Sequence, residues 1–306
     1  MNSEIDVHEP VSFSEDSDDD SLFNEKPDLT SAPEYAEGLS SRSNVARRGV
    51  PPIPGLHFNP TTLLPADLAL SILDHIKQAN YFKGGRINQI MLFERGHDAP
   101  FEGERGTVDH DAVAQLATSR PDEELQSTLP PFLNELLSKL AVILQGRIPP
   151  ETHQLLFPPP TNEPRAARQA ILNLYHPGEG IKAHVDLLNR FGDGIIVVSF
   201  GSGIAMDFEK VTEEGQDREG VTCSSLWLEP RSVLVLEGDA RYCWTHGIAA
   251  RPGDWVEALS SEDVLEDEAK VEVPEAEWVL RGVRVSITLR WLLPGAEVVG
   301  GSRKDS

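Results

Sequence analysis

The stretch from Ile171 to Asp207 decides the fold and the chemistry of this chain, and it reads ILNLYHPGEGIKAHVDLLNRFGDGIIVVSFGSGIAMD. At its centre, His184 and Asp186 stand two residues apart between short β-rich segments. In an extended strand, side chains at positions i and i+2 leave from the same face, so an imidazole and a carboxylate can reach one metal ion together. A His-x-Asp pair is also common as a polar surface pair, so it does not predict a metal site by itself.

A second histidine, His246, follows sixty residues after Asp186 in the segment RYCWTHGIAARPG. Because a jelly-roll barrel brings distant strands side by side, a third ligand at this separation is geometrically reasonable. Two histidines and one carboxylate form the facial triad that holds Fe(II) in non-heme oxygenases and leaves coordination positions open. On its own, His246 is explained equally well as a turn residue before Gly247.

The segment RVSITLR, residues 284 to 290, alternates polar and apolar residues with a period of two, which is typical of a β-strand. Arg284, Ser286 and Arg290 therefore share one face. This face could be an exposed polar face of an antiparallel sheet. If it lines a barrel interior instead, its arginines require anionic partners, since an unpaired buried charge is very costly. A dicarboxylic cosubstrate supplies such partners, and the planar fork of arginine suits carboxylates.

Four motifs together resemble the AlkB family of Fe(II)- and 2-oxoglutarate-dependent dioxygenases: Asn173-x-Tyr175, His184-x-Asp186, His246 and the strand at 284 to 290. Their order and the spacing of eleven residues between the first two motifs match the family, while Ser286 stands where Asn is usual. The phrases NLYHPGEGIKAHVD and RYCWTHGI look most like the eukaryotic AlkB homologue group that includes tRNA wobble-uridine hydroxylases. The resemblance covers roughly Gly55 to Pro294.

This resemblance implies the cofactors and the role of each motif residue. It implies that Fe(II), 2-oxoglutarate and O2 are used, and that the iron ligands are His184, Asp186 and His246. It places the distal carboxylate of 2-oxoglutarate on Arg284, with Asn173, Tyr175 and Ser286 in the same cosubstrate site. Arg290 is expected near the metal, close to the substrate and to the other carboxylate, and it is counted among the catalytic residues.

The substrate expectation starts from Leu188, two places after the metal-binding aspartate. DNA-repair members of the family carry an acidic residue there that faces the damaged base. A leucine cannot accept a hydrogen bond from a base amino group. We therefore expect hydroxylation or oxidative demethylation of a modified nucleic acid, with RNA or tRNA favoured over DNA.

The formal net charge of −23 at pH 7 supports a different expectation. Nucleic-acid binding draws on counterion release by basic groups, so this charge opposes tight binding of DNA or RNA by the chain alone. A protein hydroxylase or demethylase acting on a basic protein is therefore an alternative. An inactive AlkB-fold binding module is another, although the complete triad and both arginines count against it.

The predicted fold is mainly β with flanking helices, an α+β arrangement around a double-stranded β-helix (jelly-roll) core. Short β-rich segments separated by glycine or charged turns predict this core: RQAILNLY, GIIVVSF, GIAMDF, TCSSLWL, SVLVLEG and GVRVSITLR. Apolar residues at helical spacing predict helices over residues 65 to 79 and 130 to 148.

The domain organisation is predicted from shifts in composition, beginning with residues 1 to 40, where twelve acidic residues face a single lysine. Interleaved aromatic and basic residues from Tyr81 to His110 resemble the nucleotide-contacting lid of AlkB relatives. The acidic stretch at 254 to 278 is predicted to be an inserted surface loop that borders the substrate opening. Four regions result: a disordered acidic tail and linker at 1 to 50, a helical and lid extension at 51 to 160, the dioxygenase core at 161 to 294, and a disordered C-terminus at 295 to 306.

The cellular setting is predicted from what the sequence lacks. Its two cysteines, Cys223 and Cys243, form no CxxC pair and no disulfide framework. No stretch approaches the roughly 18 apolar residues of a membrane span, and the acidic start differs from a targeting signal. We therefore expect no membrane partner and a cytoplasmic or nuclear location.

Overall fold

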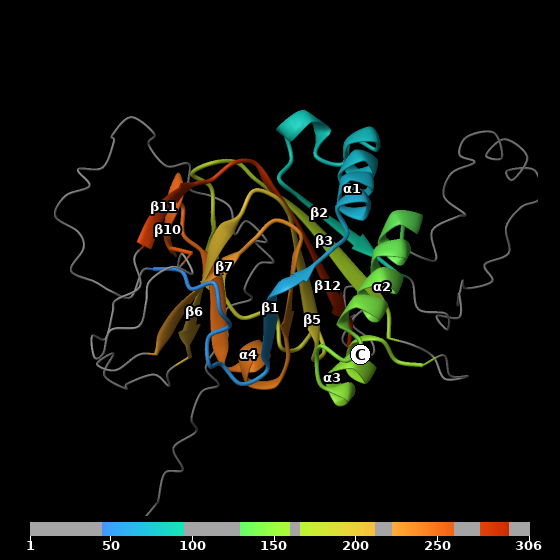
Figure 1. The fold of residues 1–306 in the computed structure, drawn as a ribbon. Coiled ribbons are helices and arrows are strands. Elements are labelled where there is room, and N and C mark those ends of the chain that lie inside the picture. The colour runs from blue at the N-terminus through green and yellow to red at the C-terminus, as the bar shows by residue number, and fades with distance from the viewer. Residues whose placement is uncertain (1–44, 95–128, 160–165, 212–221, 260–275, 294–306) are drawn as a thin grey trace, which may run out of the picture.

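The computed structural model describes residues 45–94, 129–159, 166–211, 222–259 and 276–293. Within these ranges, two antiparallel sheets face each other and helices cover the outer face of the larger sheet (Figure 1). This arrangement is the predicted double-stranded β-helix with flanking helices. No helix in these ranges is both long and apolar enough to cross a membrane.

The larger sheet has six strands in the order β1-β8-β5-β12-β3-β2. Along the sheet these are β1 (Leu56–Leu63), β8 (Ser232–Leu236), β5 (Ile195–Gly201), β12 (Arg284–Trp291), β3 (Arg168–Tyr175) and β2 (Gln89–Phe93). The smaller sheet has the order β4-β9-β6-β7. Its strands are β4 (Ile181–His184), β9 (Trp244–Ile248), β6 (Ile204–Lys210) and β7 (Cys223–Leu228). All six β-rich segments identified in the sequence form strands.

Four α-helices and one 3-10 helix accompany the sheets in the described ranges. They are α1 (Ala66–Gln78), the 3-10 helix η2 (Lys83–Gly85), α2 (Pro131–Leu144), α3 (Pro150–Leu156) and α4 (Gly238–Tyr242). Helices α1 and α2 confirm the two predicted helices. The sequence pattern did not indicate α3 or α4, because helices of one or two turns carry little apolar periodicity.

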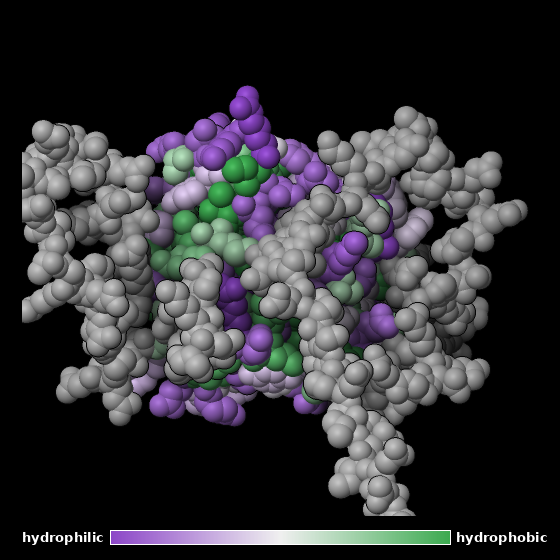
Figure 2. Space-filling view, turned by 180° about the vertical axis from the view of Figure 1, so that it is seen from behind, coloured by the Kyte–Doolittle hydropathy of each residue, from purple (hydrophilic) through white to green (hydrophobic). Residues whose placement is uncertain are grey.

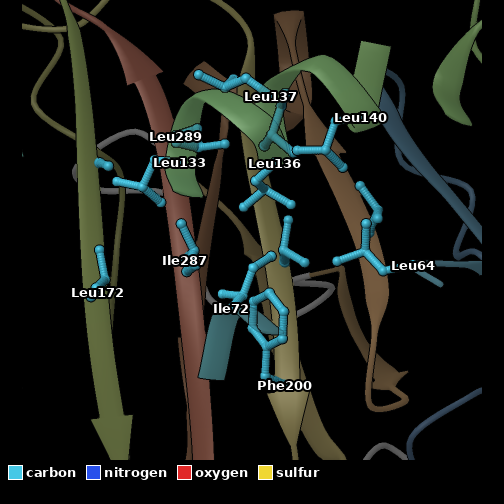
Figure 3. Close-up of a cluster of buried hydrophobic side chains, with 14 of the residues drawn as sticks. Leu64, Ile72, Leu133, Leu136, Leu137, Leu140, Leu172, Phe200, Ile287 and Leu289 are labelled. Carbon is cyan, nitrogen blue, oxygen red and sulfur yellow. The ribbon is translucent and has the colours of Figure 1, made fainter. Parts of the chain in front are cut away.

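The main core lies between α1, α2 and the outer face of the larger sheet. Figure 3 shows leucines of α2 pointing toward Ile287 and Leu289 of β12, with Ile72 of α1 close by. The period-two pattern of β12 turns these apolar side chains toward the helices. It therefore turns Arg284 and Arg290 toward the space between the two sheets.

The segment around Ala46 was expected to be part of a linker, but it is bound to two strands. The amide of Ala46 donates to the carbonyl of Trp255 at 2.8 Å, and that of Arg47 donates to Ser225 O at 2.9 Å. The guanidinium of Arg48 contacts the carboxylates of Glu229 and Glu277. Edge strands have unpaired backbone groups, and this segment satisfies some of them.

The predicted lid is only partly a feature of the surface. Phe82 is buried in the main core, and the ring centroid of Tyr81 lies 6.1 Å from that of Phe132 in α2. The ring of Phe82 therefore stabilises helix packing and is not free to stack on a base, which corrects the expectation for this residue, while Tyr81 is only partly buried against the same core. Lys83 and Arg86 are exposed. Residues 95 to 110 lie outside the described ranges.

The ends of the acidic insert form a two-stranded sheet of β10 (Gly253–Glu257) and β11 (Ala276–Leu280). Val256 of β10 packs with Ala205 and Trp227, on the face of β6 and β7 that looks away from the larger sheet. The described ends of the insert therefore lie behind the smaller sheet, and its centre, residues 260 to 275, is outside the described ranges. Its role at a substrate opening stays a hypothesis.

A buried ion pair secures this region. Asp254 is 0% exposed and accepts hydrogen bonds of 2.7 Å from both Nε and Nη2 of Arg281 and from Nε of Arg251. Burial by itself raises the pKa of Asp254, but the hydrogen bonds and charges of the two arginines outweigh it and lower the pKa below the usual value. The carboxylate is therefore charged throughout the physiological pH range.

We expect Asp254→Asn to lower the free energy of unfolding at neutral pH by about 3 to 5 kcal/mol, because it leaves Arg281 buried without its carboxylate. A carboxyl group with a lowered folded pKa stabilises the fold above its unfolded pKa, about 3.9, and loses this effect as the pH falls through the folded pKa. Urea unfolding should therefore show a difference in the free energy of unfolding between variant and wild type that narrows only at acid pH. The exposed Asp74→Asn is the control. An equal loss of unfolding free energy in both variants would contradict the role of the buried ion pair.

Candidate metal centre

Three predicted ligands, His184, Asp186 and His246, meet at one point in the space between the sheets. His184 ends β4 and pairs directly with His246 of β9 in the antiparallel ladder. Their ring centroids are 4.6 Å apart, and Asp186 follows two residues after β4. One candidate ligand atom from each residue can be chosen such that all lie within 4.8 Å of one another. Strand pairing therefore brings together residues that are far apart in the sequence.

The two histidines are held in the form that binds a metal. Nδ1 of His184 lies 2.8 Å from the carbonyl of Lys182, so this nitrogen donates its proton there and Nε2 is left as the ligand. Burial lowers the pKa of His184, and the charge of Arg290 acts in the same direction. Burial, followed by the charges of His184 and Arg241, lowers the pKa of His246 to about 3. Neutral imidazoles and a carboxylate suit a divalent transition metal.

Two arginines hold Asp186, which is 6% exposed. The guanidinium of Arg290 contacts Oδ1 of the carboxylate. Nη1 of Arg241 donates to the backbone carbonyl of the same residue at 2.9 Å. The other carboxylate oxygen, Oδ2, lies 3.7 Å from Nε2 of His246. Asp186 is therefore held through both its side-chain carboxylate and its backbone carbonyl.

The inner face of β3 and β12 carries the other residues expected at the site. Arg284 pairs with Tyr175, and Ser286 pairs with Asn173, in the antiparallel register of these strands. All four side chains are buried. Arg284 donates from Nη2 to Ser199 Oγ at 3.0 Å, and its Cζ lies 5.2 Å from the ring centroid of Tyr175.

The guanidinium of Arg284 has unused donors. Within the described ranges, its Nε and Nη1 have no hydrogen-bond partner, although the residue is only 1% exposed. Burial lowers the pKa of Arg284 and raises the pKa of Tyr175. An arginine nevertheless stays charged in proteins. A buried cation with free N–H groups fits an anionic cosubstrate, and a carboxylate is the group that its planar fork matches best.

Several residues of this lining escaped the sequence analysis. Gln89 donates to Asn173 Oδ1 at 3.0 Å, and Gln169 accepts from Nε of Arg290 at 2.7 Å. Gln169 shares the alternating face of β3 with Asn173, so the period of RQAILNLY could have revealed it. Arg241 carried no such signal, because a lone arginine in a loop-like sequence looks like a surface residue.

An aromatic ring and a cation stack beside the metal ligands. The Cζ atom of Arg290, whose guanidinium contacts Asp186, lies 3.4 Å from the centroid of the Phe191 ring. Leu187 and Leu188, which follow Asp186, are 51% and 56% exposed. Figure 2 shows the molecule from behind the view of Figure 1, where hydrophobic and hydrophilic residues lie side by side on the surface.

A double-stranded β-helix that carries a His-x-Asp pair and a distant histidine defines an iron-dependent oxygenase. The chain matches the 2OG-Fe(II) oxygenase superfamily over residues 68–290, which is more than half of its length, and it belongs to this superfamily. Membership establishes Fe(II) and 2-oxoglutarate as its metal and cosubstrate, and the three ligands fit that metal.

Relatives place the chain among the AlkB-like members. It is 36% identical over 169 residues to the tRNA (carboxymethyluridine(34)-5-O)-methyltransferase ALKBH8 of Mus musculus, which covers 55% of this chain and 21% of the mouse protein. It is 28% identical over 131 residues to the probable RNA/DNA demethylase ALKBH6 of Danio rerio, covering 41% of this chain and 53% of that protein. The chain thus spans about a fifth of the mouse relative and about half of the zebrafish relative.

A solved structure was also matched. The structure of OsALKBH1 aligns with 78% of this chain and 98% of its own, with 14% sequence identity and a TM-score of 0.37.

We expect His184→Ala to abolish tight binding of Mn²⁺, a redox-stable stand-in for Fe(II), because two remaining ligands hold a divalent ion poorly. Calorimetric titration of the purified chain measures this. The control is His75→Ala, which removes an exposed histidine of α1 that contacts the carbonyl of Ser71 and the ring of Phe132 and lies outside the triad. Unchanged Mn²⁺ affinity in His184→Ala would mean that the metal binds elsewhere.

Proposed function

We propose that the protein hydroxylates or oxidatively demethylates a modified base in RNA, with tRNA as the first substrate to test. The similarity to the mouse protein supports this, because that protein is named for a modified uridine of tRNA and its match covers 55% of this chain. The exposed Leu188, two residues after Asp186, supports RNA over the substrates of DNA-repair members, since it offers no acceptor for a base amino group.

The cosubstrate site that we propose consists of Arg284, Tyr175, Asn173 and Ser286. The observation that carries this assignment is the Arg284 guanidinium, a buried cation with two unused nitrogens. A carboxylate that accepts hydrogen bonds from this guanidinium removes the cost of an unpaired buried charge. The hydroxyls of Tyr175 and Ser286 and the amide of Asn173 lie on the same inner face and add polar contacts.

Arg290 acts at the metal end of the site in this proposal. Its contact with Asp186 holds the metal-binding carboxylate, and its bond to Gln169 fixes the guanidinium in turn. In this proposal the same guanidinium also binds the second carboxylate of 2-oxoglutarate. When bound, Fe(II) and 2-oxoglutarate supply with O2 the oxidant that hydroxylates a substrate carbon, and demethylation results where that carbon is an N-methyl group.

The protein's charge favours a second candidate function. A formal net charge of −23 attracts basic partners and repels a phosphate backbone. A hydroxylase or demethylase of a basic protein would use the same metal and the same cosubstrate site. The two candidate functions are therefore distinguished by which substrate accelerates turnover, and metal binding does not distinguish them.

We expect Arg284→Met to raise the KM for 2-oxoglutarate by roughly a hundredfold or more, since breaking a buried charge pair costs about 3 to 5 kcal/mol. Succinate formation at increasing 2-oxoglutarate concentration gives this KM. The matched control is Arg147→Met, which removes an exposed guanidinium bonded to Thr62 at 3.0 Å. An unchanged KM in Arg284→Met would place the cosubstrate elsewhere.

We expect total tRNA to accelerate succinate formation by the purified Fe(II)-loaded protein more than methylated DNA oligonucleotides or a basic histone fraction do. Mass spectrometry of the digested tRNA should then show an oxidised nucleoside. The His184→Ala variant controls for turnover that does not depend on the triad. Stimulation by histones alone would replace the RNA proposal with the second candidate.

A further inference from the structure

Arg241 is a buried cation that is neither a predicted metal ligand nor part of the proposed cosubstrate site. It lies in helix α4, five residues before His246, and it is 2% exposed. Among the described residues, no carboxylate lies within ion-pair distance of its guanidinium, although the charge of Asp193 raises its pKa against the larger effect of burial. A charge buried in this way needs strong hydrogen bonds to be tolerated.

Backbone carbonyls of one loop supply these hydrogen bonds. Nη1 donates to the carbonyl of Asp186 at 2.9 Å, while Nη2 donates to those of Leu187 and Phe191 at 3.3 Å each. This loop begins with the metal ligand Asp186. Arg241 belongs to the segment that leads into β9, the strand of the metal ligand His246. One guanidinium therefore joins the backbone around Asp186 to the approach to His246.

A second contact attaches the far end of the same loop to α4. Oδ1 of Asp193 accepts a hydrogen bond of 3.0 Å from the amide of Gly238, the first residue of α4, and one of 2.8 Å from Gly194. The loop from Asp186 to Asp193 is thus bound to α4 near both of its ends. Because Asp186 lies beyond the end of β4, the ladder between β4 and β9 does not fix it.

We propose that Arg241 is a positioning residue of the metal centre, which sets the backbone of Asp186 against the strand of His246 so that the ligands are in place before the metal binds. This inference rests on the metal assignment made above. Groups that orient metal ligands typically contribute 10- to 100-fold to metal affinity. The planar fork of arginine can reach several carbonyls at once, whereas the single ammonium of lysine is a compact point donor.

The alternative is that Arg241 only stabilises the fold. Arg281 provides a matched control for this, because it is also buried and also donates to backbone carbonyls, those of Glu179 and Ala249. It does not contact the loop from Asp186 to Asp193. Loss of either arginine should lower the melting temperature, but loss of Arg241 alone should weaken metal binding.

The test compares the full chain with its Arg241→Met, Arg241→Lys and Arg281→Met variants. Calorimetric titration gives the Kd for Mn²⁺, and melting in the presence of a chelator gives stability without metal. We expect Arg241→Met to raise the Kd by about tenfold or more. Arg241→Lys should recover part of this loss, and Arg281→Met should melt earlier than wild type with a Kd that changes less than about twofold.

A folded Arg241→Met with a Kd within about twofold of wild type would overturn the proposal, as would an equal loss of affinity in Arg281→Met. If Arg241→Met does not fold, Arg241→Gln takes its place under the same criterion, because a neutral amide cannot span the three carbonyls. Failure of the wild-type chain to bind Mn²⁺ would instead refute the metal assignment. The two failures are therefore distinguishable.

Discussion

Strand β12 has two faces with opposite requirements, and both the core and the site depend on keeping them apart. Ile287 and Leu289 pack under the helices, while Arg284 and Arg290 face the space between the sheets. Because side chains alternate along a strand, a shift of one residue would bury both arginines under the helices and remove the apolar face from the core. Pairing with β3 on one side and β5 on the other fixes the register.

The electrostatics of the site oppose the charge of the whole chain. Arg241, Arg284 and Arg290 are all held inside a protein whose formal net charge is −23. The charge of Arg290 helps to keep His184 neutral, and that of Arg241 helps to keep His246 neutral. All three cations favour anions in the interior, where the low dielectric strengthens each interaction. The total charge governs encounters with large partners, but the local cations govern what binds at the metal.

Much of the architecture followed from local patterns. The alternation in RQAILNLY and RVSITLR predicted β3 and β12, and helical spacing predicted α1 and α2. Other elements had no such pattern: β1 contains Pro60, and β10 and β11 include the two ends of an acidic stretch that was predicted to be a loop. Phe82 was misassigned to a lid because aromatic residues beside cations look the same in a surface loop and at a core boundary.

The sequence by itself determined the chemistry of the metal site, since His184, Asp186 and His246 are recognisable by residue type and order, and it determined which residues share a strand face. Only the tertiary structure decided which side chains complete the site. Gln89 meets Asn173, and Arg241 reaches the backbone of Asp186, through contacts between distant segments of the chain. Such contacts depend on how the strands pair and where the loops cross, and no local period records this.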